Sequence, residues 1–191
     1  SSRGFGASMT VTTEPRLRRM TGTPRWRQFA DAVLCRADPR VDRRIRELLN
    51  DDGQWRLVAR LTPYDRRHLL TVHDRLVAAG YTDPDLLRAA LLHDIGKADE
   101  RARVGTPHRV LRVVLRRVWP GLLRWLATER KLSHRLYLAE HHAALGARAA
   151  RQAGASERCC ALIAAHEATS DATADRLLLA LIAADSGAPL P

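Results

Sequence analysis

In the stretch Leu91-Leu92-His93-Asp94-Ile95-Gly96-Lys97, an apolar helix is predicted to end in two adjacent side chains that can bind metal. Adjacent side chains point in different directions within a helix, but they can converge at a helix end, where the backbone turns. Gly96 gives the backbone the freedom for that turn, and Lys97 would then lie beside the same site. The stretch predicts a helix that leads into a metal-binding doublet.

Two further candidate ligands lie far from the doublet in the sequence. His68 lies on a predicted helix over 63–79, and Asp185 ends an almost wholly apolar helix. A carboxylate in that position sits at the margin of the core, where a bound cation would offset the cost of its desolvation. His73, on the same helix as His68, is the alternative ligand. Imidazole and carboxylate ligands suit Mn, Mg, Fe, Co, Ni or Zn, so the pattern leaves the identity of the divalent metal open.

In chain order, His68, the His93-Asp94 doublet and Asp185 resemble the H…HD…D signature of the HD-domain superfamily of metal-dependent phosphohydrolases. The match spans residues 68–185, and the string from His93 to Lys97 is similar to the doublet of small bacterial HD proteins of the HDIG type. The resemblance implies an all-α fold, an HD-domain-like helical bundle with the metal site in its centre.

The resemblance extends to two later histidines. His142, with Gly146, is similar to the family's His-Pro-x-x-Gly step, with alanine in place of proline, and His166 is similar to the histidine that follows. In the family these two residues help to bind a second metal, so the site would hold one or two ions. His141 could take the place of His142. His108 and His134 are expected to be exposed or to lie beside the site without binding metal.

The resemblance also implies a reaction, the hydrolysis of a nucleotide or another small phosphate ester by a metal-activated water. Asp94 and Lys97 would be the catalytic residues, with Asp94 bridging two ions and Lys97 contacting the substrate phosphate. Further phosphate contacts are predicted among four arginines, Arg101, Arg103, Arg109 and Arg112. Glu167 is followed by Ala-Thr-Ser-Asp rather than by the Gly-Tyr-Pro of HD proteins that cleave cyclic dinucleotides, so that activity is not expected.

Two other functions are compatible with the same ligand order. An HD-fold di-iron oxygenase would use the same residues, and a non-catalytic metal-binding module could regulate a partner or bind nucleic acid. The net charge of +11 is concentrated in residues 1–30 (+5) and 99–135 (+7). Arginine matches phosphate oxygens, but aromatic residues make up only 5% of the chain, too few for a base-stacking platform. Nucleic-acid binding is therefore the less favoured hypothesis.

The chain of 191 residues is expected to fold as one domain made of helices. Residues 1–20 are predicted to be a disordered, tag-like N-terminus, 21–61 a helical lead-in and 62–191 the HD domain. Five helices are predicted to begin with a capping side chain followed by proline, at Thr23-Pro24, Asp38-Pro39, Thr62-Pro63, Asp83-Pro84 and Thr106-Pro107. The predicted helices span 24–36, 39–50, 63–79, 84–93, 107–118, 121–128, 131–152, 156–167 and 172–184.

Composition excludes several classes of protein. No apolar run is long enough to span a bilayer, no secretory signal is recognisable, and three cysteines cannot form a disulfide framework. We therefore expect a cytoplasmic protein; the sequence does not indicate its oligomeric state. The basic and apolar stretch 107–126 fits either a helix on an anionic membrane or a helical hairpin packed on its own domain with arginines outward. The second interpretation is preferred.

Overall fold

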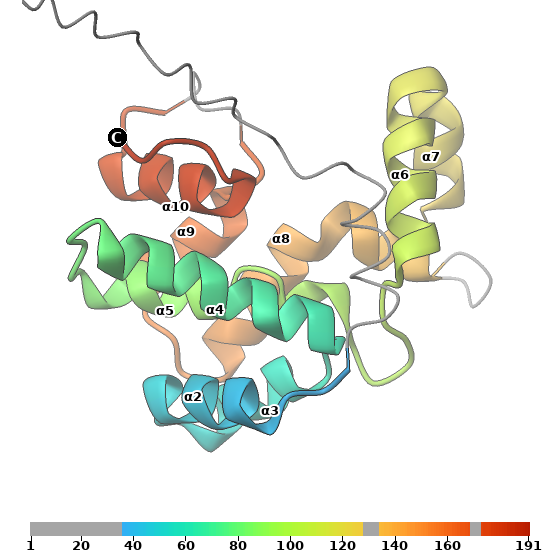
Figure 1. The fold of residues 1–191 in the computed structure, drawn as a ribbon. Coiled ribbons are helices and arrows are strands. Elements are labelled where there is room, and N and C mark those ends of the chain that lie inside the picture. The colour runs from blue at the N-terminus through green and yellow to red at the C-terminus, as the bar shows by residue number, and fades with distance from the viewer. Residues whose placement is uncertain (1–35, 128–133, 169–172) are drawn as a thin grey trace, which may run out of the picture.

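The computed structural model describes residues 36–127, 134–168 and 173–191, and within these ranges it contains helices and no strand (Figure 1). The all-α prediction is confirmed. The predicted disordered segment 1–20 lies outside the described residues, as does the predicted helix over 24–36 apart from residue 36. The helices are α2 (Pro39–Leu49), α3 (Asp52–Ala59), α4 (Pro63–Ala78), α5 (Pro84–Leu92), the short 3-10 helix η1 (Ile95–Lys97), α6 (Thr106–Val118), α7 (Pro120–Leu126), α8 (His134–Gln152), α9 (Glu157–Ala165) and α10 (Arg176–Ser186).

Three of the predicted helix starts are capped by the expected side chains. The carboxylates of Asp38 and Asp83 accept hydrogen bonds from backbone N–H groups in the first turns of α2 and α5, and the Thr62 hydroxyl does so for α4. The predicted cap at Thr106 is wrong, because α6 begins at Thr106 itself and Gly105 occupies the capping position. The predicted proline is present in the first turn of all four helices. It is tolerated there because the backbone N–H that proline lacks would have no hydrogen-bond partner within the helix.

Helix α3 was not predicted. Asn50 ends α2 in the left-handed conformation with a φ of 47°, and the Asp51 carboxylate then accepts a hydrogen bond of 2.8 Å from the Gln54 N–H to start α3. The predicted start of α10 at residue 172 is also wrong. The Asp175 side chain caps that helix, so its first residue is Arg176.

The bundle is built around α4 and α5, which lie side by side in its middle (Figure 1). Helices α9 and α10 lie on one side, α2 and α3 on the other, and α8 packs against η1 and α9. Burial of leucine, isoleucine and alanine side chains is the main source of stability here. One core cluster joins residues of all these helices, including Ile45, Val58, Leu69, Leu76, Leu86, Leu92, Ile95, Ala150, Ile163 and Leu181.

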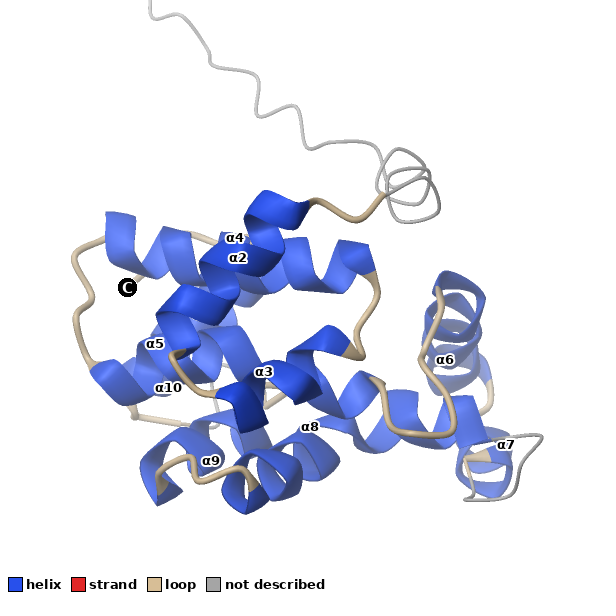
Figure 2. Cartoon of the chain, turned by 90° about the horizontal axis from the view of Figure 1, so that it is seen from below, coloured by secondary structure: helices blue, strands red, loops and turns tan. Residues whose placement is uncertain are grey.

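Helices α6 and α7 form a hairpin at one side of the bundle, in Figure 1 and in the rotated view of Figure 2. Leu123 and Ala127 are buried against Leu136 of α8, with Leu115 and Leu126 packed beside them. The rest of the hairpin departs from the preferred expectation, because seven of its large apolar side chains are exposed to solvent. The exposed apolar residues are Val110, Leu111, Val113, Val114, Val118, Trp119 and Trp125. None of the helices described is both long and apolar enough to cross a membrane.

Candidate metal centre

His93 is the C-terminal cap of α5 and its side chain is completely buried. Its Nδ1 lies 3.0 Å from the carbonyl oxygen of Ala90, one turn earlier in the helix. A carbonyl can only accept, so Nδ1 carries the hydrogen and donates it. The other ring nitrogen, Nε2, is buried without a hydrogen-bond partner among the described residues. Buried polar atoms are rarely left in this state, which makes Nε2 a candidate metal ligand.

His142 and His166 repeat the arrangement of His93. Nδ1 of His142 donates to the Ala139 carbonyl at 3.0 Å, and Nδ1 of His166 donates to the Ile163 carbonyl at 2.7 Å. Both side chains are buried, and His166 caps the end of α9 as His93 caps α5. The ring of His166 lies edge-on to both of the others, with centroids 5.1 Å and 5.2 Å away. Three helices therefore present three imidazoles in one fixed tautomer.

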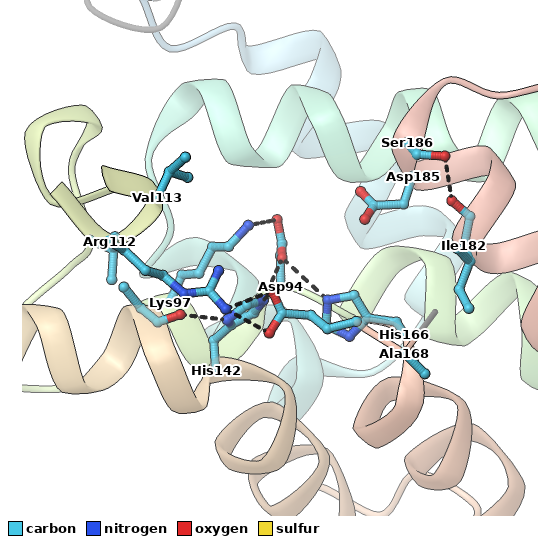
Figure 3. A pocket seen from close by; sticks show the side chains of 13 residues that line it. Asp94, Lys97, Arg112, Val113, His142, His166, Ala168, Ile182, Asp185 and Ser186 are labelled. Carbon is cyan, nitrogen blue, oxygen red and sulfur yellow. Dashed lines mark hydrogen bonds and ion pairs between the residues drawn. The ribbon is translucent and has the colours of Figure 1, made fainter. Parts of the chain in front are cut away.

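Asp94 lies among these rings and is itself buried (Figure 3). Its Oδ1 is 3.7 Å from Nε2 of His142 and 4.0 Å from Nε2 of His166. Its Oδ2 is 3.7 Å from Nε2 of His93. Donor atoms that share one ion at about 2.1 Å lie about 3–4 Å from one another. The two oxygens of Asp94 thus face different histidines at separations that suit shared ions.

The remaining two predicted ligands meet at the same place from α4 and α10. His68 Nε2 lies 2.7 Å from Asp185 Oδ1, and that oxygen is 3.4 Å from Nε2 of His93. The donor atoms of these three residues all lie within 4.8 Å of one another, as do those of His93, Asp94 and His166. The fold therefore brings all six predicted ligands together, although residues 68 and 185 are 117 positions apart.

The alternative ligands lie elsewhere. His73 is buried, and its Nδ1 is 2.9 Å from the neighbouring Asp74 carboxylate rather than near the cluster. His141 is exposed and packs on the ring of Tyr137, with centroids 4.7 Å apart. Of the predicted phosphate contacts, Arg101 and Arg103 are exposed and are not among the residues that line the cavity beside the site. The side chain of Arg109 lies outside the described part of the structure.

A cavity of about 350 Å³ opens onto the cluster and adds two residues to it. Arg112 of α6 lines this cavity, with its Nη2 2.9 Å from Glu167 and its Nε 2.8 Å from Glu140. Glu167 Oε1 lies 3.7 Å from Nε2 of His142. Glu167 was not predicted as a site residue. The signal was present, because His166-Glu167 at the end of α9 repeats the order of His93-Asp94 at the end of α5.

Among known proteins, no family model, no curated protein and no solved structure matches this chain. The chemistry of the site must therefore be judged from its own geometry and charges. The resemblance of the ligand order to that of the HD superfamily therefore remains a prediction.

The charges of the site are arranged around Asp94. Lys97 Nζ lies 2.6 Å from Asp94 Oδ2. Burial by itself would raise the pKa of Asp94, but Lys97 and the nearby histidines hold it well below its usual value. Burial would likewise raise the pKa of Asp185, and the hydrogen bond from His68 lowers it far below its usual value. Both carboxylates are therefore ionised at neutral pH and available to a cation.

The groups that face Nε2 of His93 show whether these residues fit a metal ion. With Nδ1 bonded to Ala90, a neutral His93 points its Nε2 lone pair at two carboxylates, Asp94 and Asp185. Three electron-rich atoms that face one another need a cation between them. Burial by itself would lower the pKa of His93, but Asp94 and Asp185 raise it overall. When no metal is bound, a proton on Nε2 therefore supplies the positive charge between these atoms. The donor set of imidazoles and carboxylates fits a divalent ion at the same position.

Arg75 of α4 fixes the end of the helix that carries Asp185. Its Nη1 donates to the carbonyl of Ala184 at 2.5 Å, and its Nη2 donates to that of Ala188 at 2.7 Å. Charged donors satisfy terminal carbonyls that a helix leaves without partners. Arg75 therefore holds Asp185 in register with His68, which lies two turns earlier on α4. Nothing in the sequence pattern distinguished Arg75 from the other arginines.

The buried state of His142 gives the metal-free protein a pH dependence. Burial lowers the pKa of His142 to about 4 from 6.5. The unfolded chain therefore binds the proton first, so the stability contributed by neutral His142 is complete above about pH 6.5 and is lost as the pH falls towards about 4. At about pH 5 the expected loss is about 2 kcal/mol.

Urea unfolding with a chelator present measures this loss. Between about pH 7 and about pH 5, the free energy of unfolding of the wild-type protein should fall by about 2 kcal/mol more than that of His142→Gln. Equal losses in the two proteins would show that His142 is not held neutral by its surroundings.

Proposed function

We propose that this protein is a metal-dependent phosphohydrolase of the HD type that acts on a nucleotide or another small phosphate ester. One observation carries the proposal. Three buried histidines of one tautomer direct their Nε2 atoms around the two oxygens of a buried aspartate, Asp94. Core packing alone would not favour this arrangement, because it leaves buried polar atoms such as Nε2 of His93 without a hydrogen-bond partner.

The residues divide into two groups that share Asp94. His68, His93, Asp94 and Asp185 would hold one divalent ion, and Asp94, His142 and His166 would hold a second. Bound there, divalent metal would supply hydroxide at neutral pH and positive charge for the phosphoryl oxygens. The ionised carboxylates of Asp94 and Asp185 balance that charge. Their low pKa values keep them ready to bind over the physiological range.

With divalent metal bound, the cavity would favour an anionic substrate, because the metal would offset the carboxylates of Asp94, Glu167 and Asp185 that also line it. Lys97 and Arg112 line one part of it, and the histidine cluster lines another. Arg112 adds a positive charge to the cavity, and its Nε and Nη2 are held in place by Glu140 and Glu167. The volume of about 350 Å³ falls at the lower end of the range for small-molecule sites. A mononucleotide or a smaller phosphate ester suits this space.

Matched pairs of variants test the metal site. Mass spectrometry of protein purified without chelator should find about two equivalents of metal in the wild-type protein, His141→Ala and His73→Ala. His142→Ala and His68→Ala should lose metal, because each removes a ligand next to an intact control on the same helix. Nucleotides and simple phosphate esters are then screened with Mn, Mg, Co and Fe.

The other outcomes of this experiment are equally definite. Bound iron, oxygen uptake and no phosphate release would favour the di-iron oxygenase. A wild-type protein that takes up no metal even after reconstitution would rule out both enzymes and leave a binding module. Metal loss in His73→Ala, with retention in His68→Ala, would contradict the assignment of ligands.

Lys97 is expected to act on substrate rather than on metal. In Lys97→Met, we expect kcat to fall about 100-fold while metal content is unchanged, because a cation that stabilises phosphoryl charge is lost and no ligand is removed. Steady-state kinetics with the best substrate, together with metal analysis, measures both quantities. Arg101→Met is the control, since Arg101 is exposed outside the cavity. A metal content that falls with kcat would assign Lys97 to site assembly instead.

A further inference from the structure

We propose that the α6–α7 hairpin docks onto the surface of an anionic membrane, a property independent of the proposed hydrolysis. The first observation is where exposed apolar side chains gather. Eight large hydrophobic residues are exposed in the described chain, and seven of them lie in this hairpin. Val118, Trp119 and Trp125 are 72%, 65% and 73% exposed. Scattered exposed apolar residues are ordinary on a protein surface, but a cluster of this kind marks a contact surface.

Four of the exposed apolar side chains of α6 follow one stripe. Val110, Val114 and Val118 are four residues apart, and Leu111 lies beside them, so all four share a face of the helix. Trp119 continues the stripe into the turn between the helices, and Trp125 adds a second aromatic ring from α7.

The stripe faces away from the rest of the protein. Arg112, on a different face of α6, reaches back to Glu140 of α8 and to Glu167. Leu115 and Leu123 bind the hairpin to the bundle. In Figure 1 the pair of helices stands at the side of the bundle, clear of α4 and α5. The apolar stripe is thus presented to the surroundings by a hairpin that is anchored on its other side.

The positive charge of the hairpin indicates an anionic partner. Residues 101–128 contain seven arginines and no aspartate or glutamate. Arg116, Arg117 and Arg124 are exposed among the apolar side chains. Arginine can lay its aliphatic stem along an apolar surface while its charged end reaches a phosphate. An anionic bilayer offers phosphate groups next to an apolar interior, and tryptophan is enriched at that boundary.

Two other partners fit less well. A second copy of the same face would bring arginines against arginines with no carboxylate in the hairpin to balance them. A nucleic acid would satisfy the arginines through its phosphates but would leave the valine stripe without an apolar partner. Only the lipid surface uses both kinds of side chain. The contact would lie in the plane of the interface, since no described helix can span a bilayer.

Vesicle binding by the full chain tests the proposal. The protein should sediment with vesicles of phosphatidylcholine and phosphatidylglycerol, and much less with phosphatidylcholine alone. Its tryptophan fluorescence should be quenched when the lipid carries bromine on its acyl chains. Trp119→Ser/Trp125→Ser should weaken binding at least tenfold and abolish the quenching. Arg116→Gln/Arg117→Gln/Arg124→Gln should weaken binding about 100-fold, at about fivefold for each arginine.

The matched control is Arg40→Gln/Arg43→Gln/Arg44→Gln, which removes the same charge from exposed positions of α2 and should bind vesicles nearly as the wild-type protein does. Circular dichroism confirms folding, which exposed substitutions should preserve. Equal weakening by the α2 control would reduce the effect to net charge and overturn the proposal. So would a wild-type protein that binds no vesicles but binds duplex DNA or RNA through the three hairpin arginines, or one that forms a dimer through the tryptophans.

Discussion

Asp94→Asn is expected to lower phosphate-ester hydrolysis by about 1000-fold or more and to remove most of the bound metal. Asp94 is the one residue shared by both predicted ion sites, with Oδ1 facing His142 and His166 and Oδ2 facing His93. Asparagine keeps the shape of the side chain and loses its charge. It also replaces one oxygen with an NH2 group that cannot bind a cation. Both groups of ligands are therefore damaged by a single change.

Metal analysis and initial rates measure the two effects, and Asp74→Asn is the control. Asp74 is exposed on α4 and contacts His73, away from the cluster. The Asp74→Asn protein should keep its metal and its activity. If Asp94→Asn remained fully loaded with metal but inactive, Asp94 would be a catalytic group and not a bridging ligand. If it remained active, the proposed site would be wrong.

Gly96→Ala is expected to destabilise the fold by about 4 kcal/mol and to impair the metal site at the same time. A Cβ at position 96 would overlap the carbonyl oxygen of His142 and would lie 2.7 Å from the backbone nitrogen of Gly146. These are backbone atoms of α8, which cannot rotate away as a flexible side chain could. Helix α8 would have to move from η1, and it would carry His142 away from Asp94.

Chemical denaturation of the two proteins measures this loss, with Gly121→Ala as the control. A Cβ at Gly121 meets nothing within 4 Å, and alanine favours a helix over glycine, so this change should be neutral or slightly stabilising. A loss below about 1 kcal/mol for Gly96→Ala would show that α8 adjusts to η1 without strain. A stable variant that had lost its metal would separate the two effects.

The sequence predicted those features of the fold that local chemistry determines. Capping carboxylates at Asp38 and Asp83, each followed by proline, located two helix starts correctly. The break at Asn50 was missed, because a left-handed asparagine inside a polar run has no distinct pattern. The exposure of the hairpin was missed for a different reason. An amphipathic pattern shows that a helix has an apolar face and does not show what covers it.

In the candidate site, too, some residues were predicted from the sequence and others were missed. The six candidate ligands were predicted from the resemblance of their order along the chain to a known family, and the structure brings their side chains together. Arg75 was not identified, because the carbonyls that it binds are brought to it only by the tertiary structure. Glu167 was missed although its position after His166 repeats the order of His93-Asp94. Glu167 meets Arg112 of α6, and Arg75 meets the carbonyls at the end of α10. Gly146 was noted only as part of a motif, and its physical reason comes from the structure, where a Cβ at 146 would lie 3.2 Å from the backbone nitrogen of Gly96.

The hydrogen bonds that orient His93, His142 and His166 bear on how the protein would obtain its metal. Each ring donates to a neutral carbonyl of its own helix, whereas many metal-binding histidines donate to a carboxylate that makes the ring a stronger base. Donation to a carbonyl sets the tautomer of each ring without that increase in basicity. Raw affinity for divalent ions follows one general order at such sites, so the ion that is bound also depends on which metals are available. The ion carried by the protein would follow supply in the cell, and its activity would vary with the growth medium.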